Sequence, residues 1–506
     1  MQTPTTNDTA PRPSLLGAAS CIGFLCFMMF AQIFLLGEDW VTHISLIFAI
    51  VVCSIVALVS GFTWHDIQKG ILYGCEIAML PMLILMMVGV LVASWIASGT
   101  IPSLVYYGLQ LINPSYFLVT AVLVCSIASL VTGSSWTTAA TFGVAFMGIG
   151  SGLGIPPAMT AGAVISGAIF GDKISPISDS TNLAAGIAEA NLFDHIRSMF
   201  YTTGPAWIIT AVLFFFLGLG YQGEADTSQA DLLRAGILDN YSVSLFAFIP
   251  PLVVLVLAYR RVSALAVMVI GSLVGGAMAV AVQGVGIGDM MNYMNYGYVS
   301  ETGIEPVDSL LSRGGLQEMM WTISLGFIGL SLGGLLEKTR MLEVLLGSLG
   351  KLVSNARGLI VTHVLASLAT NLFSASQYIA IIIPGRMLVP AYRKLKILPS
   401  VCSRTCEDSA TVTSPLVPWG LGGAYYMGVL DVSAWDYMGW TFLALITPLI
   451  AVAYAMGNLF IWREGERNDV NTYYQQPAGQ RDPSRNSIAD QAHGMASTSW
   501  RSPADH

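Results

Sequence analysis

Long apolar stretches constrain the fold of this chain more than any other feature of its sequence. Hydrophobic residues make up 54% of the 506 residues and charged residues only 10%, whereas soluble domains carry roughly 25% charged residues. The apolar stretches run over residues 14–36, 43–63, 70–98, 115–131, 135–150, 155–170, 203–220, 241–259, 262–283, 317–336, 357–373, 376–391 and 438–462. Several approach or exceed the ~20 residues that cross a bilayer as a helix. We therefore predict an all-α polytopic membrane protein with about 9–11 spans and additional re-entrant pieces.

The two ends of the chain are polar. Residues 1–13 contain prolines and lack the charged and apolar regions of a cleaved signal peptide. Residues 463–506 are rich in Gln, Asn, Ser and Pro, a composition that cannot bury enough apolar surface to fold, so we predict a disordered cytoplasmic tail. Between the ends we expect two membrane repeats, 14–220 and 241–462, joined by an extracytoplasmic linker over 221–240.

Charged loops indicate how the chain is oriented in the membrane. Basic residues gather in short segments at 260–261 and 393–396, whereas segments 221–240 and 284–316 are rich in acidic residues. Loops rich in Lys and Arg stay in the cytoplasm. This asymmetry predicts that both termini are cytoplasmic.

The two halves of the chain share a weak internal similarity. At an offset near 235–240 residues, segment 129–132 (SLVT) falls on 367–370 (SLAT) and Asp172 falls on Asp408. Several matches near one offset favour duplication over chance. Because the first half is expected to start inside and the second outside, we predict two inverted-topology repeats whose interrupted helices meet near the midplane.

Segment 171–182 is polar although it lies between apolar stretches. It holds Asp172 and Asp179 together with several hydroxyls and an amide. Charged side chains at membrane depth are costly and mark functional sites, and Pro176 with the nearby glycines disfavours a continuous helix. An interrupted membrane helix exposes backbone carbonyls and amides that can coordinate ions. The segment therefore predicts a cation pathway.

Four polar stretches supply the oxygen ligands that a hard cation such as Na+ prefers. The predicted cation and proton ligands of the first interrupted helix are Asp172, Ser175, Ser178, Asp179, Thr181 and Asn182. Those of the second are Glu407, Asp408 and Thr411. Two further polar clusters contribute Ser135 and Asn371. We expect all four stretches to converge on one site.

Asp172 and Asp408 are the leading candidates for coupling to protons. Removal from water raises the pKa of a carboxyl and a nearby cation lowers it, so a buried aspartate can exchange Na+ for H+. A structural ion pair is the alternative, because Lys173 adjoins Asp172 and Arg404 precedes Asp408 by the four residues of a helical salt bridge. For Asp179 the alternative is a helix cap.

Several other functions find no support in the sequence. The seven cysteines lie mostly in apolar stretches, and the spacing of Cys402 and Cys406 differs from the Cys-x-x-Cys of zinc and redox motifs. The sequence shows no nucleophile–base set, nucleotide loop or metal-ligand cluster, so we predict neither an enzyme nor a cofactor, and no metal beyond transported Na+. A net charge of −8 spread over loops gives no basis for nucleic-acid binding.

The polar segments resemble those of a known family. Segments 171–182 (GDKISPISDSTN), 192–197 (LFDHIR) and 202–205 (TTGP) are similar to the NhaC family of Na+/H+ antiporters, as are 407–411 (EDSAT) and 414–419 (SPLVPW). The resemblance covers residues 14–462. It implies a secondary transporter of the bacterial inner (plasma) membrane that exchanges Na+ for H+, built from inverted repeats with hairpins and interrupted helices.

The resemblance leaves the substrate open, because the family also includes malate/lactate exchangers coupled to Na+ and H+. Lys173, Arg386, Arg404 or the ends of half-helices could hold such carboxylates. An ion channel is a further alternative, although channel filters usually form between several chains. The expected partners are Na+, H+ and the lipid bilayer, and the sequence leaves a homodimer open.

Overall fold

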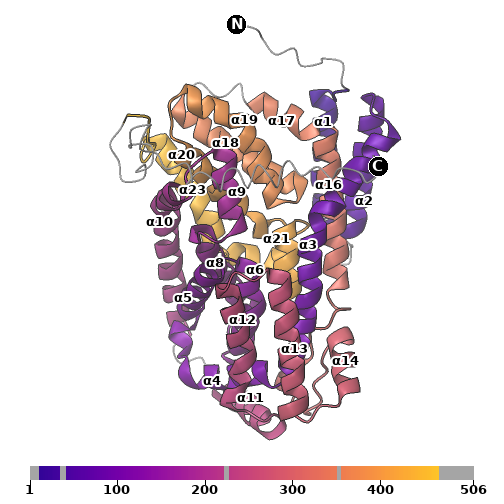
Figure 1. Ribbon diagram of the computed structural model, residues 1–506, viewed down its shortest axis with the longest axis vertical. Coiled ribbons are helices and arrows are strands. Elements are labelled where there is room, and N and C mark those ends of the chain that lie inside the picture. Colours follow the sequence, from indigo (N-terminus) through magenta and orange to yellow (C-terminus); the bar gives the residue numbers. More distant parts are fainter. Residues whose placement is uncertain (1–10, 35–41, 222–226, 350–354, 466–506) are drawn as a thin grey trace, which may run out of the picture.

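The structure is a computed structural model that describes residues 11–34, 42–221, 227–349 and 355–465. These residues form an elongated bundle of helices (Figure 1). Its β-pairing, within the described ranges, is limited to two isolated bridges, Tyr298 with Arg313 and Ile397 with Arg463. The predicted all-α class is confirmed.

The first half of the chain forms ten α-helices and one π-helical turn. They are α1 (Leu15–Phe34), α2 (Thr42–Val59), α3 (Trp64–Ala97), α4 (Thr100–Leu111), α5 (Pro114–Thr132), α6 (Ser135–Thr138), the π-turn η1 (Ala139–Gly143), α7 (Val144–Gly152), α8 (Pro157–Ile174), α9 (Asp179–Ala188) and α10 (Leu192–Leu219). The break between α8 and α9 falls inside the polar segment 171–182, as predicted.

The second half begins with helix α11 (Thr227–Asn240), so most of the predicted linker over 221–240 is helical. The following elements are η2 (Leu245–Phe248), α12 (Ile249–Tyr259), α13 (Ala264–Val282), α14 (Ile287–Tyr296), α15 (Glu305–Leu311), α16 (Met320–Lys338), α17 (Met341–Leu349), α18 (Ala356–Ser374), α19 (Gln377–Lys394), α20 (Pro399–Cys406), η4 (Glu407–Thr411), η5 (Ser414–Leu416), α21 (Leu421–Leu430), α22 (Ala434–Tyr437), η6 (Met438–Trp440) and α23 (Phe442–Gly457). In Figure 1, α4 and α11 lie at one end of the bundle and α17 and α19 at the other.

Seven helices in the described ranges are long and apolar enough to cross a membrane, namely α2, α3, α5, α10, α13, α16 and α18. Two bent helix pairs raise the number to nine if each pair is one span: 230–240 with 245–259, bent by 101°, and 434–440 with 442–457, bent by 55°. The chain is therefore a multi-pass membrane protein. Within the described residues, seven spans fall below the predicted 9–11, and nine, the number if each bent pair is one span, equals the lower limit of that range.

Helix ends recur at one constant spacing along the two halves. Asn113 and Asn355 are the N-caps of α5 and α18, and the left-handed residues that follow these two helices, Gly133 and Ala375, are equally far apart. The same spacing relates the first residues of α8 and α20 and the N-caps of α10 and α22. At this spacing Asp172 corresponds to Ser414, so the offset that aligned it with Asp408 was wrong by about two helical turns. The inverted orientation of the halves stays a prediction.

Backbone contact between two long helices holds the centre of the bundle. Helix α3 packs along α16, and α2 and α13 pack against α16 and α3 respectively. A Cβ atom at Gly74 of α3 would overlap the carbonyl of Leu330, and one at Gly334 would overlap the backbone of Gly70. Small residues at such crossings let membrane helices approach closely and gain van der Waals contact.

The first residues of the predicted tail contact the rest of the protein. The amide of Leu398 donates to the carbonyl of Trp462 at 3.0 Å, and the amide of Glu464 donates to that of Lys396 at 2.9 Å. The segment up to Glu464 is thus fixed against the loop between α19 and α20. The rest of the predicted tail, and most of the predicted N-terminal segment 1–13, lie outside the described residues.

We predict that Gly74→Ala destabilises the protein by about 1–3 kcal/mol, because the added methyl group overlaps backbone atoms that cannot move aside easily. Thermal unfolding of the purified protein in detergent measures the change. Gly23→Ala in α1 is the matched control, since a Cβ there meets nothing within 4 Å. Equal melting temperatures for Gly74→Ala and Gly23→Ala would contradict the close packing of α3 on α16.

Candidate cation site

The first interrupted helix is closed by its own side chains. The hydroxyl of Thr181 donates to the carbonyl oxygens of Asp172 (3.3 Å) and Lys173 (3.0 Å), which belong to the last turn of α8. The amide of Asn182 donates to the carbonyls of Pro176 and Ser178. Thr181 and Asn182 therefore satisfy backbone groups that the break exposes.

The two serines predicted as ligands have local partners. Ser175 donates its hydroxyl hydrogen to the carbonyl of Leu130 on α5 at 2.9 Å, and the hydroxyls of Ser178 and Ser180 lie 3.2 Å apart. The Ser175 contact ties the break to α5, which packs along α8. Ser178 is buried and adjoins Asp179.

Asp172 is the buried carboxylate that faces a cavity. One of its oxygens, Oδ2, accepts a hydrogen bond of 2.7 Å from the Ser135 hydroxyl at the start of α6, and the other, Oδ1, has no partner among the described residues. The carboxyl lines a cavity of about 780 Å³. An oxygen left without a partner is costly in an apolar interior. This oxygen is therefore the natural position for a proton or a bound cation.

Asp179 lies on the wall of the same cavity but is exposed. Its Oδ2 accepts a hydrogen bond of 2.8 Å from the Tyr378 hydroxyl on α19, and its Oδ1 accepts one from the amide of Ser180. The hydrogen bond from Tyr378 links α9 to α19 at the cavity wall. The N-cap residue of α9 is Ser178 and Asp179 is the first residue of the helix, so the predicted alternative of Asp179 as the helix cap was wrong.

A fully buried ion pair joins the two interrupted helices. The Nζ atom of Lys173 lies 3.1 Å from Oδ1 of Asp408, and both side chains are 0% exposed. The hydroxyl of Thr202 on α10 donates to the same oxygen at 3.0 Å. Asp408 is therefore neutralised by a cation from the other half of the chain.

The ion pairs expected from local sequence were wrong. Arg404 contacts neither carboxylate in the described salt bridges; its Nη2 donates to the carbonyl of Phe460 at 3.0 Å, and its guanidinium lies over the ring of Trp462. Lys173 pairs with Asp408 and not with its sequence neighbour Asp172. A four-residue spacing favours a helical salt bridge only when no distant partner competes.

Glu407 carries a carboxyl group without a hydrogen bond. It is 0% exposed and neither of its oxygens has a partner among the described residues. The hydroxyls of Ser180 and Thr411 lie beside it outside hydrogen-bond geometry. A charged, unpartnered carboxylate in this position would be very costly, so Glu407 needs a proton or a cation. It belongs to the predicted set, but nothing in the sequence placed it above Asp408.

Asn371 holds the second break in shape. Its amide donates to the carbonyl of Ala410 at 2.9 Å and to the hydroxyl of Thr413 at 3.1 Å. Both acceptors belong to the turn that follows Glu407 and Asp408, where the π-helical hydrogen bonds of η4 replace the α-helical pattern. Single π-helical turns inside α-helices occur frequently at functional sites.

Comparisons with known proteins identify the family of the chain. The profile of the Na+/H+ antiporter family matches residues 13–181 and 167–458. The chain is 38% identical over 448 residues to the Na+/H+ antiporter NhaC of Alkalihalophilus pseudofirmus, covering 88% of this chain and 96% of the relative. It is 39% identical over 436 residues to NhaC of Bacillus subtilis, covering 85% and 96%. The chain belongs to the Na+/H+ antiporter family.

A further relative has a different substrate in its name. The malate-2H+/Na+-lactate antiporter of Bacillus subtilis is 34% identical over 452 residues, covering 89% of this chain and 96% of the relative. Family membership is thus compatible with transport of small ions alone and with coupled transport of organic acids. All three relatives are antiporters by name.

The structure divides eight of the eleven predicted site residues of this antiporter family member into two groups, with Ser178, Asp179 and Thr411 in neither. The first group has buried carboxyl groups in which at least one oxygen accepts no hydrogen bond from a described residue: Asp172, Glu407 and Asp408. Residues that close the breaks or position a carboxylate are Ser135, Ser175, Thr181, Asn182 and Asn371. Thr202, which contacts Asp408, was missed as a ligand, although it lies in the segment TTGP that carried part of the resemblance.

We predict that Lys173→Met lowers the stability of the protein by about 3–5 kcal/mol, because it leaves the buried Asp408 carboxylate without its cation. The double variant Lys173→Met/Asp408→Leu should recover most of this loss, since it removes both charges together. Thermal unfolding in detergent measures both. Arg234→Met, which breaks the partly exposed pair with Asp231, is the control and should change stability by about 1 kcal/mol or less. A double variant less stable than the single one would contradict the pairing.

Proposed function

We propose that this protein exchanges Na+ for H+ across the membrane, with no organic anion required. The observation that carries the proposal is the Asp172 carboxyl, which has one oxygen bound to Ser135 and the other unpartnered beside a cavity. The names of the two NhaC relatives support the choice of ions.

Competition for one carboxylate is sufficient for exchange. A protonated Asp172 and a Na+-bound Asp172 are both neutral, whereas the empty carboxylate carries a charge at membrane depth. Because an uncompensated charge there is costly, the site changes its exposure readily only when a proton or Na+ occupies it. Na+ binding on one side therefore releases a proton, and the reverse occurs on the other side.

Lys173 and Asp408 have a different role in this proposal. Their charges cancel, and both are completely buried, so the pair adds no net charge to either state. Glu407 adjoins the pair and has no partner within the described part of the chain. We assign Glu407 as a second carboxyl that carries a proton during exchange. It lies close to the charged Lys173.

We propose that the ion enters through the cavity. Its wall includes Asp172 and Asp179 and the loop between α12 and α13, where Arg261 lies. Loops with adjacent basic residues stay in the cytoplasm. We assign the cavity as open to the cytoplasm and retain the prediction that both termini are cytoplasmic. All of these side chains come from one chain, so the proposal needs no homodimer.

Exchange of an organic acid is the second candidate, and the cavity favours it. Its volume of about 780 Å³ lies within the roughly 300–1,000 Å³ of pockets that bind small organic molecules. Arg261 gives the wall a cation that a carboxylate could contact. A relative that is 34% identical to this chain is named as a malate-2H+/Na+-lactate antiporter, which supports this second candidate.

We predict that Asp172→Asn abolishes Na+-driven proton flux, because an amide cannot bind a proton and Na+ in turn. Proteoliposomes with a pH-sensitive dye, a preformed pH difference and added NaCl measure the flux. Asp231→Asn, at a side chain that is 70% exposed on α11, is the matched control and should transport normally. Flux at the control level in Asp172→Asn would exclude Asp172 as the exchange site.

The same assay separates the two candidate substrates. In vesicles without organic acids, NaCl should collapse the pH difference in the wild-type protein and KCl should do so less. A collapse that requires malate or lactate would favour the organic-acid exchanger, and Arg261→Gln should then reduce it.

We predict that the apparent affinity for Na+ falls as the pH falls. Ligands must be deprotonated to bind a cation, so protons and Na+ compete. At pH values where Asp172 is mainly protonated, the Na+ concentration for half-maximal flux should rise by about tenfold for each pH unit. Flux measured against NaCl concentration at several symmetrical pH values provides the test. A half-maximal concentration that does not change with pH would exclude competition at one carboxyl.

A further inference from the structure

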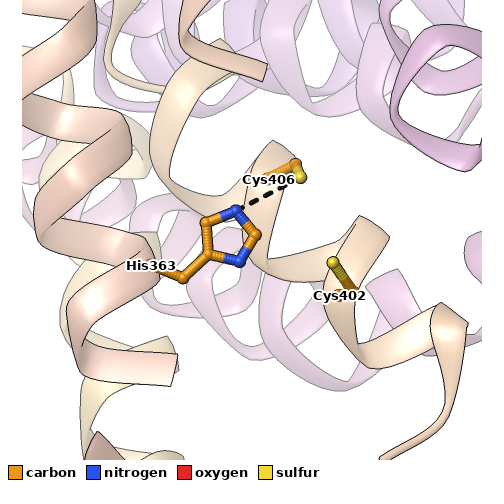
Figure 2. A group of neighbouring side chains, drawn as sticks. All are labelled: His363, Cys402 and Cys406. Atoms are coloured by element: carbon orange, nitrogen blue, oxygen red, sulfur yellow. Dashed lines mark hydrogen bonds between the residues drawn. The ribbon is translucent and has the colours of Figure 1, made fainter. Parts of the chain in front are cut away.

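A group of soft metal ligands lies outside the site described above. His363 of α18 and Cys402 and Cys406 of α20 point toward one another (Figure 2). Their ligand atoms all lie within 4.8 Å of one another, and all three residues are buried. They bring together one imidazole and two thiols from helices that are distant in sequence.

The two helices place these side chains by simple geometry. Cys402 and Cys406 are four residues apart on one helix, so they share a face one turn apart. His363 lies in the middle of α18, on the side that packs against α20. The sequence alone does not predict this group, because the imidazole belongs to α18 and the thiols to α20, with α19 between them.

The imidazole is held in the orientation that a metal ligand needs. Its Nδ1 lies 3.0 Å from the hydroxyl of Tyr392, and its Nε2 lies 3.4 Å from Sγ of Cys406. Metal-binding histidines usually donate their second ring N–H to an oxygen, which fixes the tautomer and the ring. Tyr392 supplies that oxygen here, which leaves Nε2 directed at the thiol side of the group (Figure 2).

We propose that His363, Cys402 and Cys406 bind a thiophilic divalent cation, with Zn2+ as the physiological candidate. Thiolate and imidazole are the ligands that Zn2+ prefers, and three protein ligands leave a fourth position for water. This site is separate from the Na+ site, because a hard cation prefers oxygen.

Charge balance favours a divalent ion at this depth. Binding releases one proton from each thiol to the solvent, and two thiolates, a neutral imidazole and Zn2+ then sum to zero charge. Zinc–ligand bonds of about 2.0–2.3 Å place tetrahedral ligands roughly 3.5–4 Å apart, so the widest separation in the group has to shrink by about 1 Å. Rotation of the cysteine side chains can supply a movement of this size.

The position of the group gives the proposal a structural consequence. Cys406 directly precedes Glu407, and α18 also carries Asn371, which holds the turn after Asp408. A bound ion would therefore join α18 to α20 next to the second interrupted helix. It would resist separation of these helices on heating.

The experiment uses the purified, reduced, metal-free protein in detergent, titrated with Cd2+ as a spectroscopic substitute for Zn2+. We expect one equivalent to produce the ultraviolet thiolate-to-metal charge-transfer band and to raise the melting temperature. The variants Cys402→Ser, Cys406→Ser and His363→Gln should each weaken binding by more than about tenfold, and Tyr392→Phe by about 10–100-fold as for other outer partners of metal ligands.

Cys53→Ser is the matched control. Cys21 and Cys53 are another pair of neighbouring buried thiols, on α1 and α2, and they belong to no group of three ligands within the described residues. The control should keep both the band and the melting shift. Each variant counts as folded if its gel-filtration profile is monodisperse and if its melting temperature without metal equals that of the wild-type protein.

Two results would overturn the proposal. One is a charge-transfer band of equal affinity in folded Cys402→Ser/Cys406→Ser, which would place the ion elsewhere. The other is loss of the band in Cys53→Ser with retention in His363→Gln, which would assign the ion to Cys21 and Cys53. Neither readout depends on ion flux, so the proposal stands or falls independently of Na+/H+ exchange.

Discussion

The buried ion pair of Lys173 and Asp408 is the interaction on which the arrangement of the site depends. At 3.1 Å and without solvent exposure, each charge is tolerable only because the other is present. The pair fixes the end of α8 against the π-helical turn η4. This contact brings Asp172, next to Lys173, and Glu407, next to Asp408, into one region.

The interrupted helices expose backbone carbonyl groups, and neighbouring side chains form hydrogen bonds with several of them. Thr181, Asn182 and Asn371 each donate to carbonyls that the breaks expose, as expected where non-helical backbone lies at membrane depth. The carbonyls are therefore largely structural in this conformation. Carboxyl oxygens remain without hydrogen-bond partners, which is why we propose Asp172 and Glu407 for the exchange chemistry.

The sequence predicted the helical class and the break at 171–182, because both follow from local composition. It could not predict which charges pair. Arg404 lies four residues from Asp408 and yet contacts Phe460, while Lys173 reaches Asp408 from the other half of the chain. The alignment of the halves failed for a related reason, since similar apolar residues permit several offsets and only helix caps such as Asn113 and Asn355 fix one. His363 and Cys406 likewise meet only in three dimensions.

Charge neutrality links these observations. Three buried carboxyls and one paired lysine lie at the meeting point of the two breaks, so two carboxyls stay without an ion partner. Each must hold a proton or a cation whenever the site is closed to water. A channel would need a path that stays hydrated, in which a free carboxylate is inexpensive. A site that closes around unpaired carboxyls instead permits movement only in occupied, neutral states, and this requirement by itself makes the transfer of one ion depend on the return of another.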